Sequence, residues 1–143
     1  MNRQVRFRVV LESPPAGVAF GLQKGSGSIY ETVQTQQSKG LDLTFEFSAE
    51  ATNTAAPDFR GPVVQGPRGQ RFVYIDIGTT AGQAGSPWSR RLKVPFRDIT
   101  PAMIERALKD DRVLETRVPG TGKDGTPTCA TVKPFDGWTI ASS

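Results

Sequence analysis

The sequence predicts a mainly β (β-rich α+β) fold, an antiparallel barrel or sandwich of about eight short strands with one short helix near residues 100–110. A length of 143 residues is the usual size of one domain, so we expect a single domain over 1–143. Apolar residues make up 36% of the chain, which excludes the composition of a disordered segment. Most apolar runs alternate with polar residues, the period of a strand with one buried face.

Four such runs lie in the first third of the chain. Residues 5–11 and 18–22 alternate on either side of a Pro and Gly turn, which predicts neighbouring strands joined as a hairpin. Residues 29–34 predict a third strand. The clearest run is 41–47, where Leu and Phe occupy every second position and polar residues occupy the others. Its polar face should therefore contact water.

The next run begins after a loop predicted over residues 49–57. Residues 72–77 carry large side chains on both faces, which is typical of a central strand. Residues 92–96 contain Pro95, which cannot donate a ladder hydrogen bond, so this strand should lie at an edge. Three further strands are predicted at 112–118, 128–133 and 137–140.

One helix is clearly signalled. Thr100 is a favourable N-cap, Pro101 suits the first helical position, and apolar residues then recur at helical spacing. Ile99 and Ile104 occupy the two positions of a hydrophobic staple. The helix should end near Asp110.

The composition also limits the chemistry. The chain contains no histidine and a single cysteine, Cys129, so Ser-His-Asp and Cys-His catalysis and the usual zinc sites are excluded. We expect no cofactor and no metal. Residues 1–6 lack the apolar core of a signal peptide, and no run approaches the ~20 apolar residues that span a bilayer. We therefore expect a cytoplasmic protein with no membrane partner.

A glycine motif at residues 120–125 matches the pattern GxGxxG. A dinucleotide site requires such a motif to follow a strand and open a helix. Here Pro127 and a strand-like run follow instead, so a hairpin loop is the interpretation that we favour.

Positive charge is concentrated in residues 59–97, where six arginines and Lys93 stand against Asp76 alone. The preceding segment, 31–58, holds five acidic residues against one lysine. The basic segment is rich in Gly, Pro and Arg, which suits a site for a carboxylate or a phosphate. It is equally typical of turns with arginines that are solvated or paired with acids and a tryptophan packed on the sheet. The candidate ligand-binding residues are Gln65, Arg68, Trp88, Arg90 and Arg91.

The leading hypothesis is a noncatalytic binding domain for an anionic small molecule or an acidic protein surface. The rival is a histidine-independent enzyme acting on an acidic small molecule in a β-barrel cavity, with Asp76 and Tyr74 as catalytic candidates. An inward Asp76 paired with an arginine is the structural alternative. Nucleic-acid binding is a third hypothesis, which the plentiful acids and the lack of an RRM, KH or zinc-finger pattern disfavour. Edge strands are compatible with a homodimer.

Several segments together resemble a known family. They are residues 59–69 and 71–75, Gly78 to Gln83, the Ser86-Pro87-Trp88 run, and Gly120 to Gly122 with Cys129 to Val132. In combination they are similar to an uncharacterised bacterial family of small single-domain proteins, a domain of unknown function. The resemblance covers nearly the whole chain and implies no activity and no established site residues.

Overall fold

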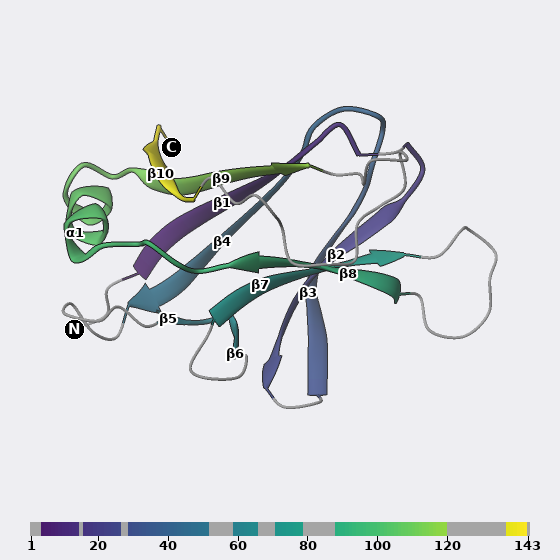
Figure 1. The fold of residues 1–143 in the computed structure, drawn as a ribbon, viewed down its shortest axis with the longest axis horizontal. Coiled ribbons are helices and arrows are strands. Elements are labelled where there is room, and N and C mark those ends of the chain that lie inside the picture. Colours follow the sequence, from purple (N-terminus) through teal and green to yellow (C-terminus); the bar gives the residue numbers. More distant parts are fainter. Residues whose placement is uncertain are drawn as a thin grey trace.

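The computed structural model describes residues 4–14, 16–26, 29–51, 59–65, 71–78, 88–119 and 137–142, and for residues 26, 29, 30, 65 and 88–90 it describes the backbone alone. These ranges contain ten strands and one helix (Figure 1). They are β1 (Gln4–Glu12), β2 (Ala19–Ser26), β3 (Ile29–Gln37), β4 (Leu43–Ala51), β5 (Phe59–Arg60), β6 (Val64–Gln65), β7 (Arg71–Gly78), β8 (Trp88–Pro95), α1 (Pro101–Lys109), β9 (Val113–Pro119) and β10 (Thr139–Ala141).

The strands form two sheets of five (Figure 1). The first sheet has the order β10-β9-β1-β4-β5. In the second, β7 lies between β2 and β8, β3 lies outside β2, and the two-residue β6 pairs with the start of β7. Neither sheet closes on itself, so the fold is a sandwich, one of the two architectures that the sequence predicted.

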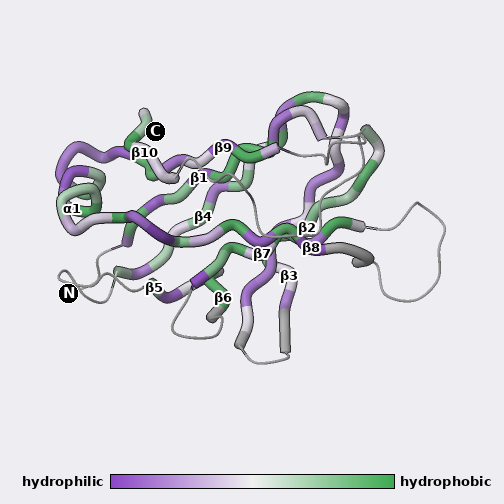
Figure 2. Tube along the Cα trace, in the orientation of Figure 1, coloured by the Kyte–Doolittle hydropathy of each residue, from purple (hydrophilic) through white to green (hydrophobic). Residues whose placement is uncertain are grey.

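The core lies between the two sheets, because alternate residues of the strands point inward. On β1, Phe7 is fully buried while its neighbours Arg6 and Arg8 lie on the outer face. Phe7 stacks on Phe47 of the adjacent strand, and Ile75 of β7 faces them from the second sheet in the same core cluster. Figure 2 shows this alternation as changes between apolar and polar colour along the strands.

The helix forms as predicted. Thr100 is extended, and its hydroxyl oxygen accepts a hydrogen bond from the backbone N–H of Met103 at 3.2 Å. The helix begins at Pro101 and ends at Lys109, with Asp110 as the C-cap. Ile99 and Ile104 both lie in the core cluster, as the staple required.

The predicted positions of two strands in the second sheet are confirmed. Strand β7 is central, and β8 pairs with β7 alone among the described strands. In the first sheet, Glu46 and Ser48 are exposed, so the polar face of β4 does contact water. That strand begins at Leu43 rather than at Leu41, whose side chain is 74% exposed.

The predicted hairpin between residues 5–11 and 18–22 is wrong. Strand β1 belongs to the first sheet, where it pairs with β4 and β9, and β2 belongs to the second sheet. Ser13 adopts a positive φ of 48° and donates its backbone N–H to Asp42, which ties the end of β1 to the start of β4. The chain then crosses between the layers. Alternation identifies a strand but carries no information about its partner.

One pairing departs from a wholly antiparallel sheet, because β1 and β9 are parallel. The chain leaves the second sheet at β8, passes through α1 and enters the first sheet as β9. The sequence did not predict the short strands β5 and β6. The predicted strand at 128–133, the glycine motif at 120–125 and Cys129 lie outside the described residues. Within the described ranges, no helix combines the length and apolar character needed to cross a membrane.

Candidate functional site

Two of the predicted site residues, Asp76 and Arg91, meet on the outer face of the second sheet. On β7, Ile75 and Ile77 point into the core, and Tyr74 and Asp76 therefore point the other way. The register between β7 and β8 places Asp76 opposite Arg91, and Tyr74 opposite Lys93. We call Tyr74, Asp76, Arg91 and Lys93 the Asp76–Arg91 site.

Asp76 and Arg91 form a bidentate ion pair. Arg91 Nε donates to Oδ1 of Asp76 at 2.5 Å, and Arg91 Nη2 donates to Oδ2 at 2.9 Å. The Asp76 side chain is 6% exposed, whereas the Arg91 side chain is 29% exposed. A buried carboxylate therefore holds one side of a guanidinium that is still partly open to solvent. The arginine pairing that was the alternative for Asp76 is present, but Asp76 points away from the main core and not into it.

The aromatic ring of Tyr74 contacts Arg91 and also the neighbouring cation, Lys93. The guanidinium carbon of Arg91 lies 4.5 Å from the centroid of the Tyr74 ring, and Lys93 Nζ lies 5.7 Å from it. Both distances are within the range of a cation–π contact. Tyr74 is itself buried beside Phe72 and Val64, in a small apolar cluster separate from the main core. Packing in this cluster therefore holds the Tyr74 ring in place beneath the two cations.

A polar extension of the site lies on β2 and was missed from the sequence. Gln23 is buried and stands opposite Tyr74 in the register between β2 and β7. Its side-chain amide donates to the hydroxyl of Thr32 at 2.8 Å, and that hydroxyl donates back to Gln23 Oε1 at 3.1 Å. Only the pairing of β2 with β7 brings Gln23 to the site, and no motif in the sequence signals that pairing.

The other predicted binding residues cannot be joined to the site. Gln65 lies on β6, opposite Arg71 in the register, and Trp88 and Arg90 lie on β8, opposite Gly78 and Ile77. For these three the structure describes the backbone alone, and Arg68 lies outside the described residues. Their part in ligand binding therefore stays a prediction.

The geometry of Asp76 bears on the predicted catalytic role. Both of its carboxylate oxygens accept hydrogen bonds from Arg91, so the carboxylate serves as an anchor for a cation. Tyr74 presents its ring to Arg91 and Lys93. This arrangement orients positive charge and does not resemble an acid and base placed around a reacting atom. Across the described ranges, acidic and thiol side chains form no group of three that could hold a metal ion.

The outer face of the first sheet has a different character, because cations and acids alternate across its strands. Arg8 on β1 donates to Glu46 on β4 at 3.0 Å and to Glu115 on β9 at 2.7 Å. The hydrogen bond to Glu115, followed by the one to Glu46, raises the pKa of Arg8 above its usual value. A similar row places Arg117 between Glu12 and Asp42.

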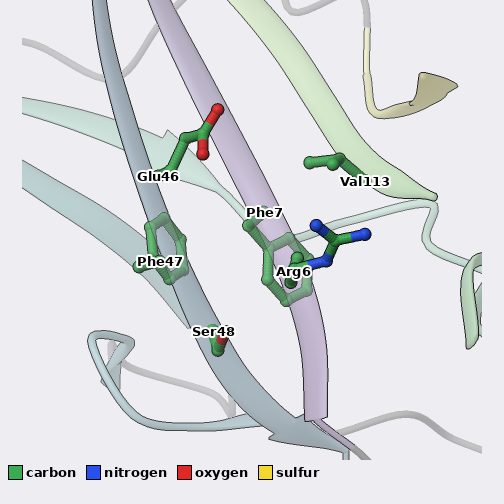
Figure 3. A pocket seen from close by; sticks show the side chains of 6 residues that line it. All are labelled: Arg6, Phe7, Glu46, Phe47, Ser48 and Val113. Atoms are coloured by element: carbon green, nitrogen blue, oxygen red, sulfur yellow. The ribbon is translucent and has the colours of Figure 1, made fainter. Parts of the chain in front are cut away.

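A hollow of about 170 Å³ opens on this face beside Arg6, Glu46, Ser48 and Val113 (Figure 3). Its two charged residues are already engaged. Arg6 Nη2 donates to Asp111 Oδ1 at 2.7 Å, and Glu46 accepts from Arg8. Both charges of the hollow are therefore compensated within the protein.

The chain was compared with known proteins. A family model described as a family of unknown function (DUF5990) matches residues 5–141, which confirms the resemblance to an uncharacterised single-domain family. No curated protein and no solved structure matches the chain. The comparisons therefore bring no activity, ligand or partner to the site.

Proposed function

The chain belongs to this family of unknown function, and we propose that it is a noncatalytic binding domain that holds an anionic small molecule at the Asp76–Arg91 site. The observation that carries the proposal is the bidentate pair between a buried carboxylate and a half-buried arginine on the sheet face that points away from the main core.

The energetics of this pair favour a binding role over a purely structural one. A buried ion pair contributes little net stability, because desolvation of the two charges offsets their attraction. Beside the pair lies the apolar cluster of Val64, Phe72 and Tyr74. Apolar residues at 76 and 91 would extend this cluster and keep the strand pairing. An ion pair at this place is better explained by the need to hold a guanidinium in one orientation.

The charge of the site selects the class of ligand. Among its described side chains, Arg91 and Lys93 carry two positive charges and Asp76 carries one negative charge. A planar guanidinium and an ammonium over one ring suit the carboxylate or phosphate groups of a small anion. The same chemistry would accept carboxylates presented by an acidic protein surface, the other source of anionic groups.

Thermal unfolding of the purified protein with citrate and with pyrophosphate tests the proposal. Ligand that binds only the folded state raises the free energy of unfolding, by about 2.7 kcal/mol at a hundredfold excess over Kd. We expect at least one of the two anions to raise the Tm of the wild type and not that of Arg91→Gln.

Arg106→Gln is the matched control. Arg106 is an exposed cation on α1, paired with Asp110 at 3.8 Å, and is not part of the site. This variant should keep the wild-type response. If neither anion shifts the Tm of the wild type, while an acidic peptide does, then the acidic protein surface is the ligand. Equal loss of the response in both arginine variants would mean that the anions act through overall charge, and would refute the site.

A further inference from the structure

Strand β3 forms one edge of the second sheet, and Figure 1 shows it beside β2 at the margin of the sandwich. Among the described strands it pairs only with β2. Strands β2 and β3 form a two-stranded ribbon, in which β2 pairs with β7 over only four residues, Phe20 to Gln23. A two-stranded ribbon is only marginally stable in water, and a third strand stabilises it.

The register shows which backbone groups of β3 point away from β2. The N–H of Ser38 donates to the carbonyl oxygen of Val18, which makes them a hydrogen-bonded position of the ladder. Hydrogen-bonded and non-hydrogen-bonded pairs alternate along an antiparallel ladder. Gln36 and Gln34 are therefore bonded to β2, opposite Phe20 and Leu22. The N–H and C=O groups of Thr35 and Gln37 point outward, toward the free edge.

Apart from one bulge, this edge lacks the features that keep edge strands from pairing with other chains. Thr32, Val33, Thr35 and Gln37 are all exposed, and Val33 is one of two exposed large apolar residues in the described chain. The run from Thr32 to Gln37 contains no charge and no proline. Lysine, proline and inward charges are the usual protection of an exposed edge. A bulge at Val33, where the register with β2 shifts, limits the regular edge to the residues that follow it.

We infer that this edge is an association surface for a second copy of the chain. The two β3 strands pair antiparallel across a two-fold axis, so that Thr35 of one copy exchanges backbone hydrogen bonds with Gln37 of the other. Such pairing gives each outward N–H and C=O group of the two residues one partner in both copies, and it joins two five-stranded sheets into one of ten strands.

The chemistry of the edge selects a second copy over another kind of partner. An acidic or basic peptide would gain nothing from the uncharged run between Thr32 and Gln37. Of the charges that flank this run, Glu31 pairs with Lys24 at 3.6 Å, and Lys39 lies beyond Ser38. An uncharged run of Thr and Gln pairs with itself without like-charge repulsion. In a two-fold dimer the β3 edge of each copy is paired with the β3 edge of the other, so association through β3 stops at the dimer.

Sedimentation velocity over a wide range of protein concentration tests the inference. We expect a species of twice the 15.5 kDa chain mass to grow with concentration in the wild type. Thr35→Lys places two like charges beside the axis, and Thr35→Pro removes an outward N–H that β2 does not use; both should stay monomeric. Ala102→Lys, which adds the same charge on the exposed side of α1, should dimerise like the wild type.

Hydrogen exchange gives a measurement that needs no variant. The amides of Thr35 and Gln37 should exchange more slowly at high than at low protein concentration, while that of Gln36 should be protected at both. A wild type that stays monomeric overturns the inference, as does a dimer that persists in Thr35→Lys. Growth beyond the dimer into larger assemblies would also overturn it, because the proposed symmetry closes.

Discussion

The side-chain amide of Gln36 donates to the backbone carbonyl oxygen of Thr44 at 2.6 Å and so connects β3 of one sheet to β4 of the other. Two residues earlier on the same face of β3, the side-chain amide of Gln34 donates to the backbone carbonyl oxygen of Glu46 at 2.6 Å. On β3 these two glutamines occupy the inward positions where β1 and β4 carry apolar residues. Hydrogen bonds from side-chain amides to backbone carbonyl oxygens thus connect the two sheets on this side of the sandwich.

Removal of the Gln36 contact should destabilise the fold. Gln36→Leu leaves the partly buried carbonyl oxygen of Thr44 without this donor, and an unsatisfied buried acceptor costs about 1–3 kcal/mol. Gln4→Leu makes the same chemical change at an exposed position of β1 and should be close to neutral. Urea unfolding of both variants measures the difference. Equal stability of the two would show that the amide contributes nothing to the closure of the sandwich.

Substitutions of Asp76 and Arg91 should affect the stability of the fold and the binding of anions differently. Asp76→Asn leaves a half-buried guanidinium without its carboxylate and should lower the free energy of unfolding by about 1–3 kcal/mol. The double variant Asp76→Leu with Arg91→Met replaces both charges by apolar groups and should recover most of that loss.

The same double variant should not bind the anions. We therefore expect a Tm near that of the wild type and no response to citrate or pyrophosphate. A double variant that is as unstable as Asp76→Asn would assign the pair a structural role. A double variant that still responds to the anions would place their site elsewhere.

Replacing Arg8 by lysine should lower the free energy of unfolding, because a single ammonium group cannot make all the hydrogen bonds of the guanidinium. Arg8 reaches Glu46, Glu115 and the carbonyl oxygen of Ser142, and its side chain and that of Glu115 are each 18% exposed. We expect Arg8→Lys to lose about 1 kcal/mol, since these partners are still partly solvated.

This loss should be constant with pH around neutrality. The pKa of Arg8 is raised in the folded state, by its hydrogen bond to Glu115 first, so the stability that it contributes is fully present below the unfolded pKa of arginine. It would disappear only as the pH rises through the folded value, in strong alkali. Urea unfolding at several pH values between 6 and 9, about the range in which proteins are most stable, measures the difference. A loss that changes across this range would contradict the assignment.

The sequence pattern correctly predicted those elements whose formation depends on residues close together in the chain. The helix between Thr100 and Asp110 follows from a cap, a proline and helical spacing, all within a few residues. The central position of β7 follows from bulk on both of its faces. In each case the deciding interactions lie within the segment or in its general exposure to water.

Partners far apart in the sequence could not be predicted in this way. Ion pairs such as that of Arg8 with Glu115, 107 residues away, depend on the order of strands in a sheet. The same limit explains the wrong hairpin and the omission of Gln23 from the site. Asp76 and Arg91 were both candidates, but only the register of β7 with β8 made them one site.

The cap of α1 offers a test of the part that was predicted. Thr100→Ala removes the hydroxyl that accepts from the N–H of Met103 and should cost about 1 kcal/mol. Thr100→Ser keeps the oxygen and should retain most of the stability. Thermal unfolding followed by circular dichroism compares the two. If alanine and serine behave alike, the hydroxyl is not what stabilises the start of the helix.

Trp138, just before β10, fastens the end of the described chain to the second sheet. Its indole N–H donates to the carbonyl oxygen of Pro95 at 3.0 Å in a buried position. Its ring stacks on Phe96 with centroids 5.1 Å apart and meets Phe7 edge to face. Because Pro95 is the last residue of β8, this one side chain links the second sheet to the segment that pairs with β9.

Two substitutions should divide the contribution of Trp138 between its ring and its N–H. Trp138→Phe keeps a ring beside Phe96 but leaves the Pro95 oxygen without its donor, and should cost about 1–3 kcal/mol. Trp138→Leu also removes the aromatic contacts and should lower the free energy of unfolding further, by up to about 3–5 kcal/mol, the range for truncation of a large buried aromatic side chain. Urea unfolding gives both values. A phenylalanine variant as stable as the wild type would show that packing alone fastens β10, because the hydrogen bond would then contribute nothing.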